Sequence, residues 1–211
     1  MKYLKPNEGL KIFDMRTNVT TAGPSPNNNE RIELFLLGCR KAYSGNPCKG
    51  CFNSTLWDHN KAEFSRDPIE LAQWFIESIP KDRRYITIGG GEPTDQIEAL
   101  IPFCKLLHEN GFHIMMYTWR ELNHLFHSNS KTDLQVKILE LFKYIDMIVD
   151  GEFKIEEKLY QEDAADGLLS SIGSGNQIIW DINKLTGYAM RDLNSISLDE
   201  NNFVVFNVKE N

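Results

Sequence analysis

Three cysteines early in the chain have the residue type and the spacing of a metal centre. Cys39, Cys48 and Cys51 form the pattern C-x8-C-x2-C. Two residues between a pair of thiolates let both sulfurs reach one metal ion or one face of a cluster. Three thiolates, rather than four, leave one metal position open for a further ligand. The sequence therefore predicts a metal centre that can do chemistry.

A glycine-rich loop is the second group of residues with chemical potential. The segment GGGEP (89–93) follows the apolar run 85–88. Glycine has no Cβ, so its backbone amides and carbonyls can approach a ligand closely. Glu92 adds a carboxylate suited to a ligand ammonium group or to orienting the loop. The loop therefore predicts a binding site for a polar, amino-acid-like ligand beside the cysteines.

A structural zinc site is the chief alternative for the cysteines. Such a site needs a fourth protein ligand, and the nearest candidate is His59, eight residues after Cys51. The sequence has no second C-x2-C or H-x3-H pair to complete a zinc finger. Disulfides are the weaker interpretation, because the chain shows no export signal and cytosolic thiols stay reduced. The fourth cysteine, Cys104, has helical spacing with apolar neighbours and is expected in the core.

Strand-like and helix-like segments alternate along the middle of the chain. Apolar runs predict strands at 31–37, 85–88, 114–117 and 147–149, and a last strand at 203–208. Capping signals predict helices after Asp67-Pro68, after Asp95 with Glu98, after Thr118 with Glu121, and a further helix is predicted at 134–142. A repeated β-then-α order implies a parallel sheet with right-handed crossovers. Because the units are too few for eight strands, the predicted fold class is α/β, a partial (β/α) barrel with mostly parallel strands.

The unusual residues fall at the carboxyl ends of these predicted strands. The cysteines follow the first strand, the glycine loop follows the second, Thr118 follows the third and Asp150 follows the fourth. In βα barrels and open α/β sheets alike, ligands bind at that edge of the sheet. The sequence therefore predicts one composite site at this edge.

Length and charge restrict the remaining possibilities. The 211 residues fit a single domain over 1–211, with a core at about 23–180 and a C-terminal extension of unassigned role. The net charge of -7 argues against nucleic acid as a partner. The N-terminus lacks the pattern of a signal peptide, and no apolar run is long enough to span a bilayer, so a membrane is not an expected partner. A cytoplasmic location is expected.

The combination of cysteines and glycine loop resembles the radical S-adenosylmethionine (SAM) superfamily. More narrowly, the chain resembles the activating enzyme of the anaerobic (class III) ribonucleoside-triphosphate reductase, over roughly residues 23–177. The matching segments are 38–39 after the first strand, 51–57 (CFNSTLW), 89–93 (GGGEP), 117–118 (YT), 149–153 (VDGEF) and 173–177 (GSGNQ). Two departures are the C-x8-C spacing, where that family usually has C-x3-C, and Ile172, where it often has a basic residue. A bulged-out loop over residues 40–47 would still return Cys48 to the metal centre.

The resemblance implies a 4Fe-4S cluster on Cys39, Cys48 and Cys51, with SAM bound at the fourth iron. One electron passed through the cluster would cleave SAM reductively, and the resulting radical would take a hydrogen from a glycine of the partner. The implied partners are the large subunit of an anaerobic ribonucleotide reductase, which is a glycyl-radical enzyme, and a flavodoxin- or ferredoxin-like electron donor.

The resemblance also implies a set of residues that contact SAM. Gly90, Gly91 and Glu92 would hold its methionine part, and Gly50 and Phe52 would pack near its adenine. Further candidates to face the cofactor are Thr118, Asp150 and Asn176, with alternative roles as a helix cap, a solvent-facing carboxylate and a turn amide. Alternatives for the whole protein are a radical SAM enzyme for a small molecule, as in modified-purine biosynthesis, an activase of another glycyl-radical enzyme, and a zinc-stabilised binding module without catalysis.

Overall fold

The computed structural model describes residues 9–19, 23, 30–61, 65–122, 132–159, 171–182, 186–189, 196–198 and 204–206. Its centre is an eight-stranded sheet in the order β3-β1-β2-β4-β5-β6-β7-β8, and its two edge strands do not pair with each other. The strands are β1 (Leu10–Val19), β2 (Arg31–Leu36), β3 (Ser65–Arg66), β4 (Tyr85–Gly90), β5 (His113–Tyr117), β6 (Met147–Asp150), β7 (Ile178–Asp181) and β8 (Thr186–Ala189). A separate two-stranded sheet contains β9 (Ile196–Leu198) and β10 (Val204–Phe206), so the strand predicted at 203–208 is present.

The sheet is mixed rather than mostly parallel, which corrects part of the predicted fold class. The pairs β2–β4, β4–β5 and β5–β6 are parallel, whereas β1–β2, β1–β3, β6–β7 and β7–β8 are antiparallel. The sequence pattern missed β1 because its pairing with β2 shifts register between Ile12 and Asp14 and again after Arg16. Such bulges break the two-residue alternation by which a strand is recognised. The α/β class is confirmed, as an open sheet with a parallel centre.

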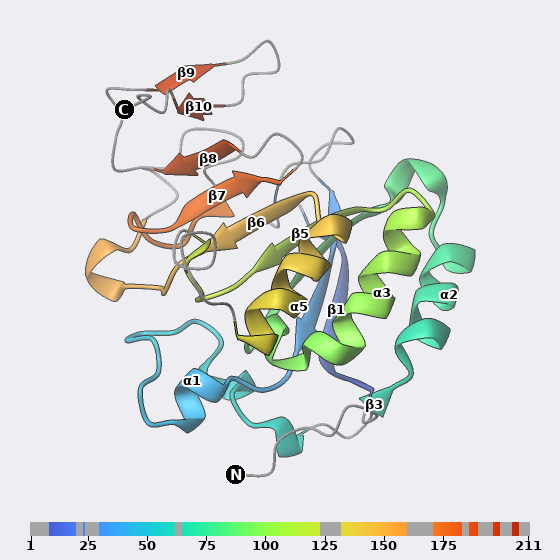
Figure 1. Ribbon diagram of the computed structural model, residues 1–211, viewed down its shortest axis with the longest axis horizontal. Helices are drawn as coiled ribbons and strands as arrows, with labels where there is room; N and C mark the ends of the chain where they lie inside the picture. The colour runs from blue at the N-terminus through green and yellow to red at the C-terminus, as the bar shows by residue number, and fades with distance from the viewer. Residues whose placement is uncertain are drawn as a thin grey trace.

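Three helices lie side by side on one face of the sheet (Figure 1). They are α2 (Pro68–Ser78), α3 (Ile97–Glu109) and α5 (Asp133–Leu141). Shorter helical turns are α1 (Arg40–Tyr43), η1 (Ser54–Leu56), η2 (His59–Lys61), η3 (Lys81–Arg83), η4 (Pro93–Gln96), η5 (Phe142–Tyr144) and η6 (Ile155–Glu157). The core lies between helices and sheet, and Phe75, Phe103 and Cys104 are buried in it with the strand residues Ile88 and Met116. Cys104 is therefore a core residue, as predicted.

The helix caps agree with the sequence in one case and differ in another. Asp67 caps α2 by accepting hydrogen bonds from the backbone amides of Ile69 and Glu70. The predicted cap of α3 is wrong, because α3 begins after Gln96 without a side-chain cap. Asp95 is instead buried and bonds elsewhere, as described below. Of the helix predicted after Thr118, the structure describes only Leu122, because residues 123–131 lie outside the described residues.

The face of the sheet that points away from these helices carries a different set of side chains. Residues alternate between the two faces of a strand, so Leu34 and Ile88 enter the core while Glu33, Phe35 and Thr87 line a cavity on the other side. The parallel strands β2, β4, β5 and β6 thus direct their carboxyl ends toward a site on the uncovered side.

None of the helices in the described ranges is long and apolar enough to cross a membrane.

Candidate metal centre

The register of β2 and β4 places the cysteine loop beside the glycine loop. Phe35 pairs with Gly89 and Leu36 with Gly90, both in parallel. Beyond the strands, the backbone amide of Gly91 donates to the carbonyl of Leu36 (2.9 Å), and that of Glu92 donates to the carbonyl of Gly38 (2.6 Å). The two loops are therefore joined by backbone hydrogen bonds directly before Cys39.

This close approach explains two of the glycines. A Cβ on Gly91 would overlap the carbonyl oxygen of Gly38, and a Cβ on Gly90 would overlap that of Leu36. Gly90 also has a φ of +113°, which side-chain-bearing residues rarely adopt. By contrast, a Cβ on Gly89 would make an ordinary contact with Tyr117 at 3.8 Å. Gly90 and Gly91 are thus required for the contact between the loops.

A cavity of about 350 Å³ opens at this edge of the sheet. All three cysteines of the predicted centre line it, together with four predicted cofactor-binding residues, Phe52, Gly90, Gly91 and Glu92, and the further candidate Thr118. Gly50, Asp150 and Asn176 are not among the lining residues. The remaining lining residues include aromatic and amide side chains that were not predicted as site residues, among them Asn53, Trp57, Tyr117, Trp119, Phe153 and Gln177. The structure therefore brings the two predicted groups to one cavity.

The three cysteines of the cavity are free thiols. Cys39 is buried, whereas Cys48 and Cys51 are half-buried. Burial raises the pKa of the Cys39 thiol to about 12 and that of the Cys48 thiol to about 11. The Cys39 and Cys48 thiols are therefore protonated in the metal-free protein, and a bound metal would displace those protons.

The donor set of the cavity suits a cluster, because its lining residues include three cysteines and no histidine. Across the part of the chain that the structure describes, no three His, Cys, Asp or Glu side chains gather closely enough to hold one metal ion. In a 4Fe-4S cluster the thiolates bind different irons, so they need not converge on one point. The proposed fourth zinc ligand, His59, does not line the cavity, and its ring stacks on Tyr43 with centroids 5.8 Å apart. This observation weighs against the zinc alternative.

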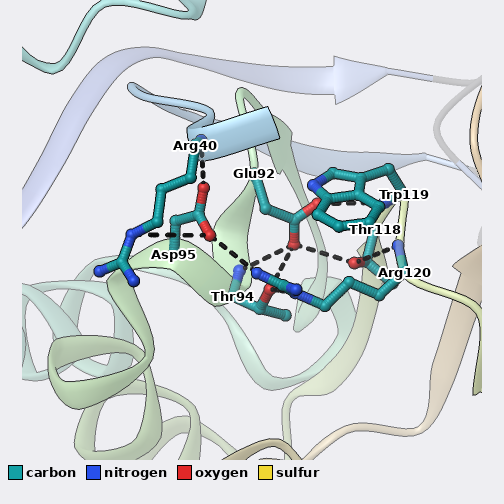
Figure 2. A network of polar contacts seen from close by, with 7 residues as sticks. All are labelled: Arg40, Glu92, Thr94, Asp95, Thr118, Trp119 and Arg120. Carbon is teal, nitrogen blue, oxygen red and sulfur yellow. Dashed lines mark hydrogen bonds and ion pairs between the residues drawn. The ribbon is translucent and has the colours of Figure 1, made fainter. Parts of the chain in front are cut away.

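Glu92 is held by the protein on both of its carboxylate oxygens (Figure 2). Its Oε1 accepts hydrogen bonds from the amide of Thr94 (3.1 Å), from the Thr94 hydroxyl (2.5 Å) and from the Thr118 hydroxyl (2.9 Å). Its Oε2 accepts from the amide of Trp119 (3.0 Å). Burial, with Asp95 nearby, raises the pKa of Glu92, and the Arg120 guanidinium opposes that shift. Of the two functions considered for Glu92, the structure shows it orienting the loop.

Thr118 lines the cavity and belongs to the same network. Besides donating to Glu92, its Oγ1 accepts a hydrogen bond from the amide of Arg120 (3.1 Å). The next residue, Trp119, places its ring 5.2 Å from the Lys41 ammonium and 4.6 Å from the Arg120 guanidinium. The loop after β5 is thus packed against the loop that carries the cysteines.

Phe52 and Phe153 form an aromatic pair on the cavity wall. Their ring centroids are 4.5 Å apart, and the Lys158 ammonium lies 5.3 Å from the centre of the Phe52 ring. Phe52 is 62% exposed, so part of its ring surface is accessible to a flat ligand. Gly50 lies off the cavity, and a Cβ there would press on Ile155 at 2.9 Å. The structure gives Gly50 a packing role in the loop.

Asn176 has the turn role that was its alternative, and its neighbour Gln177 lines the cavity. The Asn176 side chain bonds the carbonyl of Glu152 (2.8 Å) and the hydroxyl of Ser174 (2.8 Å), as a turn amide does. Gln177 lines the cavity while its Oε1 accepts from the amide of Gly173 (3.0 Å) and its Nε2 donates to the carbonyl of Gly151 (3.0 Å). The matched segment 173–177 indicated that this part of the chain belongs to the site, but it did not show which amide side chain faces the cavity.

Asp150 lies behind the site, not in solvent. It is buried, and its Oδ2 accepts a hydrogen bond from the amide of Leu122 (2.6 Å). Burial raises the pKa of its carboxyl from 3.8 to about 6, although the hydrogen bond from Leu122 favours the charged form. The solvent-facing alternative for Asp150 is therefore wrong.

Asp150→Asn is expected to reduce the pH dependence of stability. The pKa of Asp150 is higher in the folded than in the unfolded protein, so its protonated carboxyl stabilises the folded state. This stabilisation is fully present below pH 3.8 and is lost as the pH rises through about 6. Asparagine does not ionise and keeps an acceptor for Leu122, so the variant should lose roughly 2–3 kcal/mol less stability between pH 4 and pH 7 than the wild type. Urea unfolding of the metal-free protein at both pH values measures this difference. Equal losses in the two proteins would show that Asp150 titrates normally.

Comparison with known proteins identifies the class to which this fold and site belong. Residues 28–180 match the family model described as a 4Fe-4S single cluster domain, and the chain belongs to that family. The chain is also similar to the anaerobic ribonucleoside-triphosphate reductase-activating protein of Enterobacteria phage T4. The two are 25% identical over 160 residues, which cover 71% of this chain and 83% of that protein. The resemblance inferred from the sequence motifs is thereby confirmed.

Proposed function

We propose that this chain is an iron–sulfur activating enzyme that reductively cleaves SAM and generates a glycyl radical on an anaerobic ribonucleotide reductase. The observation that carries the proposal is the shared cavity, which Cys39, Cys48 and Cys51 line together with the glycine loop. Membership of the 4Fe-4S family supports the cluster, and the similarity to the phage T4 activating protein supports the partner. An electron donor of flavodoxin or ferredoxin type belongs to the same proposal.

Each group of residues has a separate task in this proposal. Cys39, Cys48 and Cys51 hold the cluster, which supplies the electron for cleavage of the carbon–sulfur bond of SAM when it is bound. The glycine loop offers its backbone to the methionine part of SAM, and Glu92 keeps that loop in place through its four accepted hydrogen bonds. Phe52 provides an aromatic surface for the adenine.

The wall of the cavity is largely apolar. Its wall includes the apolar side chains of Phe35, Trp57, Phe153 and Ile172, and its floor is the uncovered face of the sheet. Apolar walls limit the side reactions of a reactive species with solvent. The protein thus supplies position and shielding, while the cofactors supply the reactive groups.

Anaerobic reconstitution with iron and sulfide tests the proposal. We expect about four irons per chain and a brown absorbance. With a chemical reductant and SAM, the reconstituted protein should release 5′-deoxyadenosine and methionine. A single tightly bound zinc ion without iron would overturn the iron–sulfur proposal.

Electron paramagnetic resonance then tests the partner. After incubation with an anaerobic ribonucleotide reductase and SAM, the spectrum should show a glycyl radical on the reductase. Release of 5′-deoxyadenosine without a protein radical on any reductase tried would instead support a small-molecule substrate.

A further inference from the structure

The residues between Cys39 and Cys48 do not bulge away from the site but fold back onto it. The first four of them form α1, directly after Cys39. This short helix lies beyond the carboxyl ends of the central strands (Figure 1). Two polar contacts, one buried and one partly buried, attach it to the loops that follow β4, β5 and β6.

Asp95 makes the first attachment (Figure 2). Its side chain is completely buried, its Oδ2 accepts a hydrogen bond from the backbone amide of Arg40 (2.5 Å), and its Oδ1 forms an ion pair with Arg120 (2.9 Å). Cys39 occupies the N-cap position of α1 but makes no side-chain cap hydrogen bond. Asp95 therefore satisfies the first amide of the helix, and one carboxylate joins the loops after β2, β4 and β5.

Lys41 makes the second attachment. Its ammonium lies 3.1 Å from Oε2 of Glu152, which follows β6, and 5.2 Å from the centre of the Trp119 ring, which follows β5. The Lys41 side chain is 10% exposed, so its charge is largely withdrawn from water and its partners are correspondingly important. The other lysine between the cysteines, Lys49, pairs with Glu156 on the surface, where both side chains are more than half exposed.

We infer that α1 is a clasp, and that Asp95 and Lys41 are positioning residues that fix Cys39 relative to the glycine loop. The backbone before Cys39 is already fixed, because Gly38 accepts from the amide of Glu92 and the amide of Cys39 donates to the carbonyl of Trp57 (3.0 Å). The clasp fixes the backbone directly after Cys39. This inference rests on the proposed function in assigning a cluster to Cys39, but the clasp itself can be tested in the metal-free protein.

Hydrogen exchange of the metal-free, reduced protein tests the clasp. Two variants are used. Asp95→Asn replaces the carboxylate that contacts Arg40 and Arg120 with a neutral amide. Lys41→Met removes the ammonium group but keeps an apolar side chain of similar length. Both should speed exchange of the amides at 40–45 by about tenfold or more, because that segment is held by contacts the variants weaken. Lys49→Met is the matched control, since it removes the same charge from the same loop at an exposed pair, and it should exchange like the wild type. Wild-type exchange rates in both variants would overturn the clasp.

The reconstituted protein tests positioning as distinct from stability. Asp95→Asn and Lys41→Met should retain iron, but the electron paramagnetic resonance signal of the reduced cluster should change less on addition of SAM, and SAM should bind about tenfold more weakly. Lys49→Met controls for the effect of a lost charge on the cluster. Faster exchange with an unaltered SAM response would overturn the positioning role. If the wild type binds no iron, the proposed function fails, while the exchange experiment still decides whether α1 is a clasp.

Discussion

Cys48→Ala is expected to abolish both cluster assembly and reductive cleavage of SAM. Cys48 is the cysteine whose spacing from Cys39 is unusual, yet it lines the same cavity as Cys39 and Cys51. In the wild type, one iron of the cluster would lack a protein ligand. Removal of one thiolate leaves two irons without a protein ligand, and the cluster is no longer held. After anaerobic reconstitution we expect less than about a tenth of the wild-type iron content and no 5′-deoxyadenosine above background.

Cys104→Ala is the matched control for this experiment. Cys104 is a free thiol like the others, but it is fully buried in the core on α3. Its replacement should cost about 1–2 kcal/mol of unfolding free energy and leave the iron content unchanged. If Cys48→Ala keeps the wild-type rate of SAM cleavage, Cys48 is not a ligand and another residue holds the cluster.

The parallel centre of the fold could be predicted because its strands consist largely of buried apolar residues. Such strands read as continuous apolar runs, and their ends at Gly90, Tyr117 and Asp150 agree with the predictions within two residues. The antiparallel strands were less visible. In β1 the bulge after Ile12 interrupts the alternation of apolar and polar residues. A one-dimensional pattern records strand content well but records bulged pairing poorly.

The site shows the same division between short-range and long-range information. The cysteines and the glycine loop could be predicted because each is a local motif at a strand end. Asp95 could not, since its partners Arg40 and Arg120 are far away in the sequence and meet it through the sheet register. Its spacing to Glu98 resembled a helix cap, and that local signal was misleading. Buried polar networks depend on contacts that no local pattern encodes.

Gly91→Ala is expected to disrupt the site and destabilise the whole domain. A methyl group on Gly91 would overlap the carbonyl of Gly38, and this oxygen belongs to the backbone and cannot rotate away. The same carbonyl accepts the hydrogen bond from the amide of Glu92, so the clash also separates the glycine loop from the cysteine loop. Overpacking against a fixed backbone costs about 3 kcal/mol or more, and urea unfolding of the metal-free protein measures that loss.

Gly89→Ala separates this steric effect from a general sensitivity of the loop. The added methyl would meet the Tyr117 ring at 3.8 Å, an ordinary van der Waals distance, so its unfolding free energy should remain within about 1 kcal/mol of the wild type. A comparable loss in both variants would mean that any side chain in the loop is harmful, whatever its contacts. A loss confined to Gly91→Ala would instead establish that the loop needs this glycine for the approach of two backbones, and that the spacing between the cysteines and the glycine loop is set by direct contact.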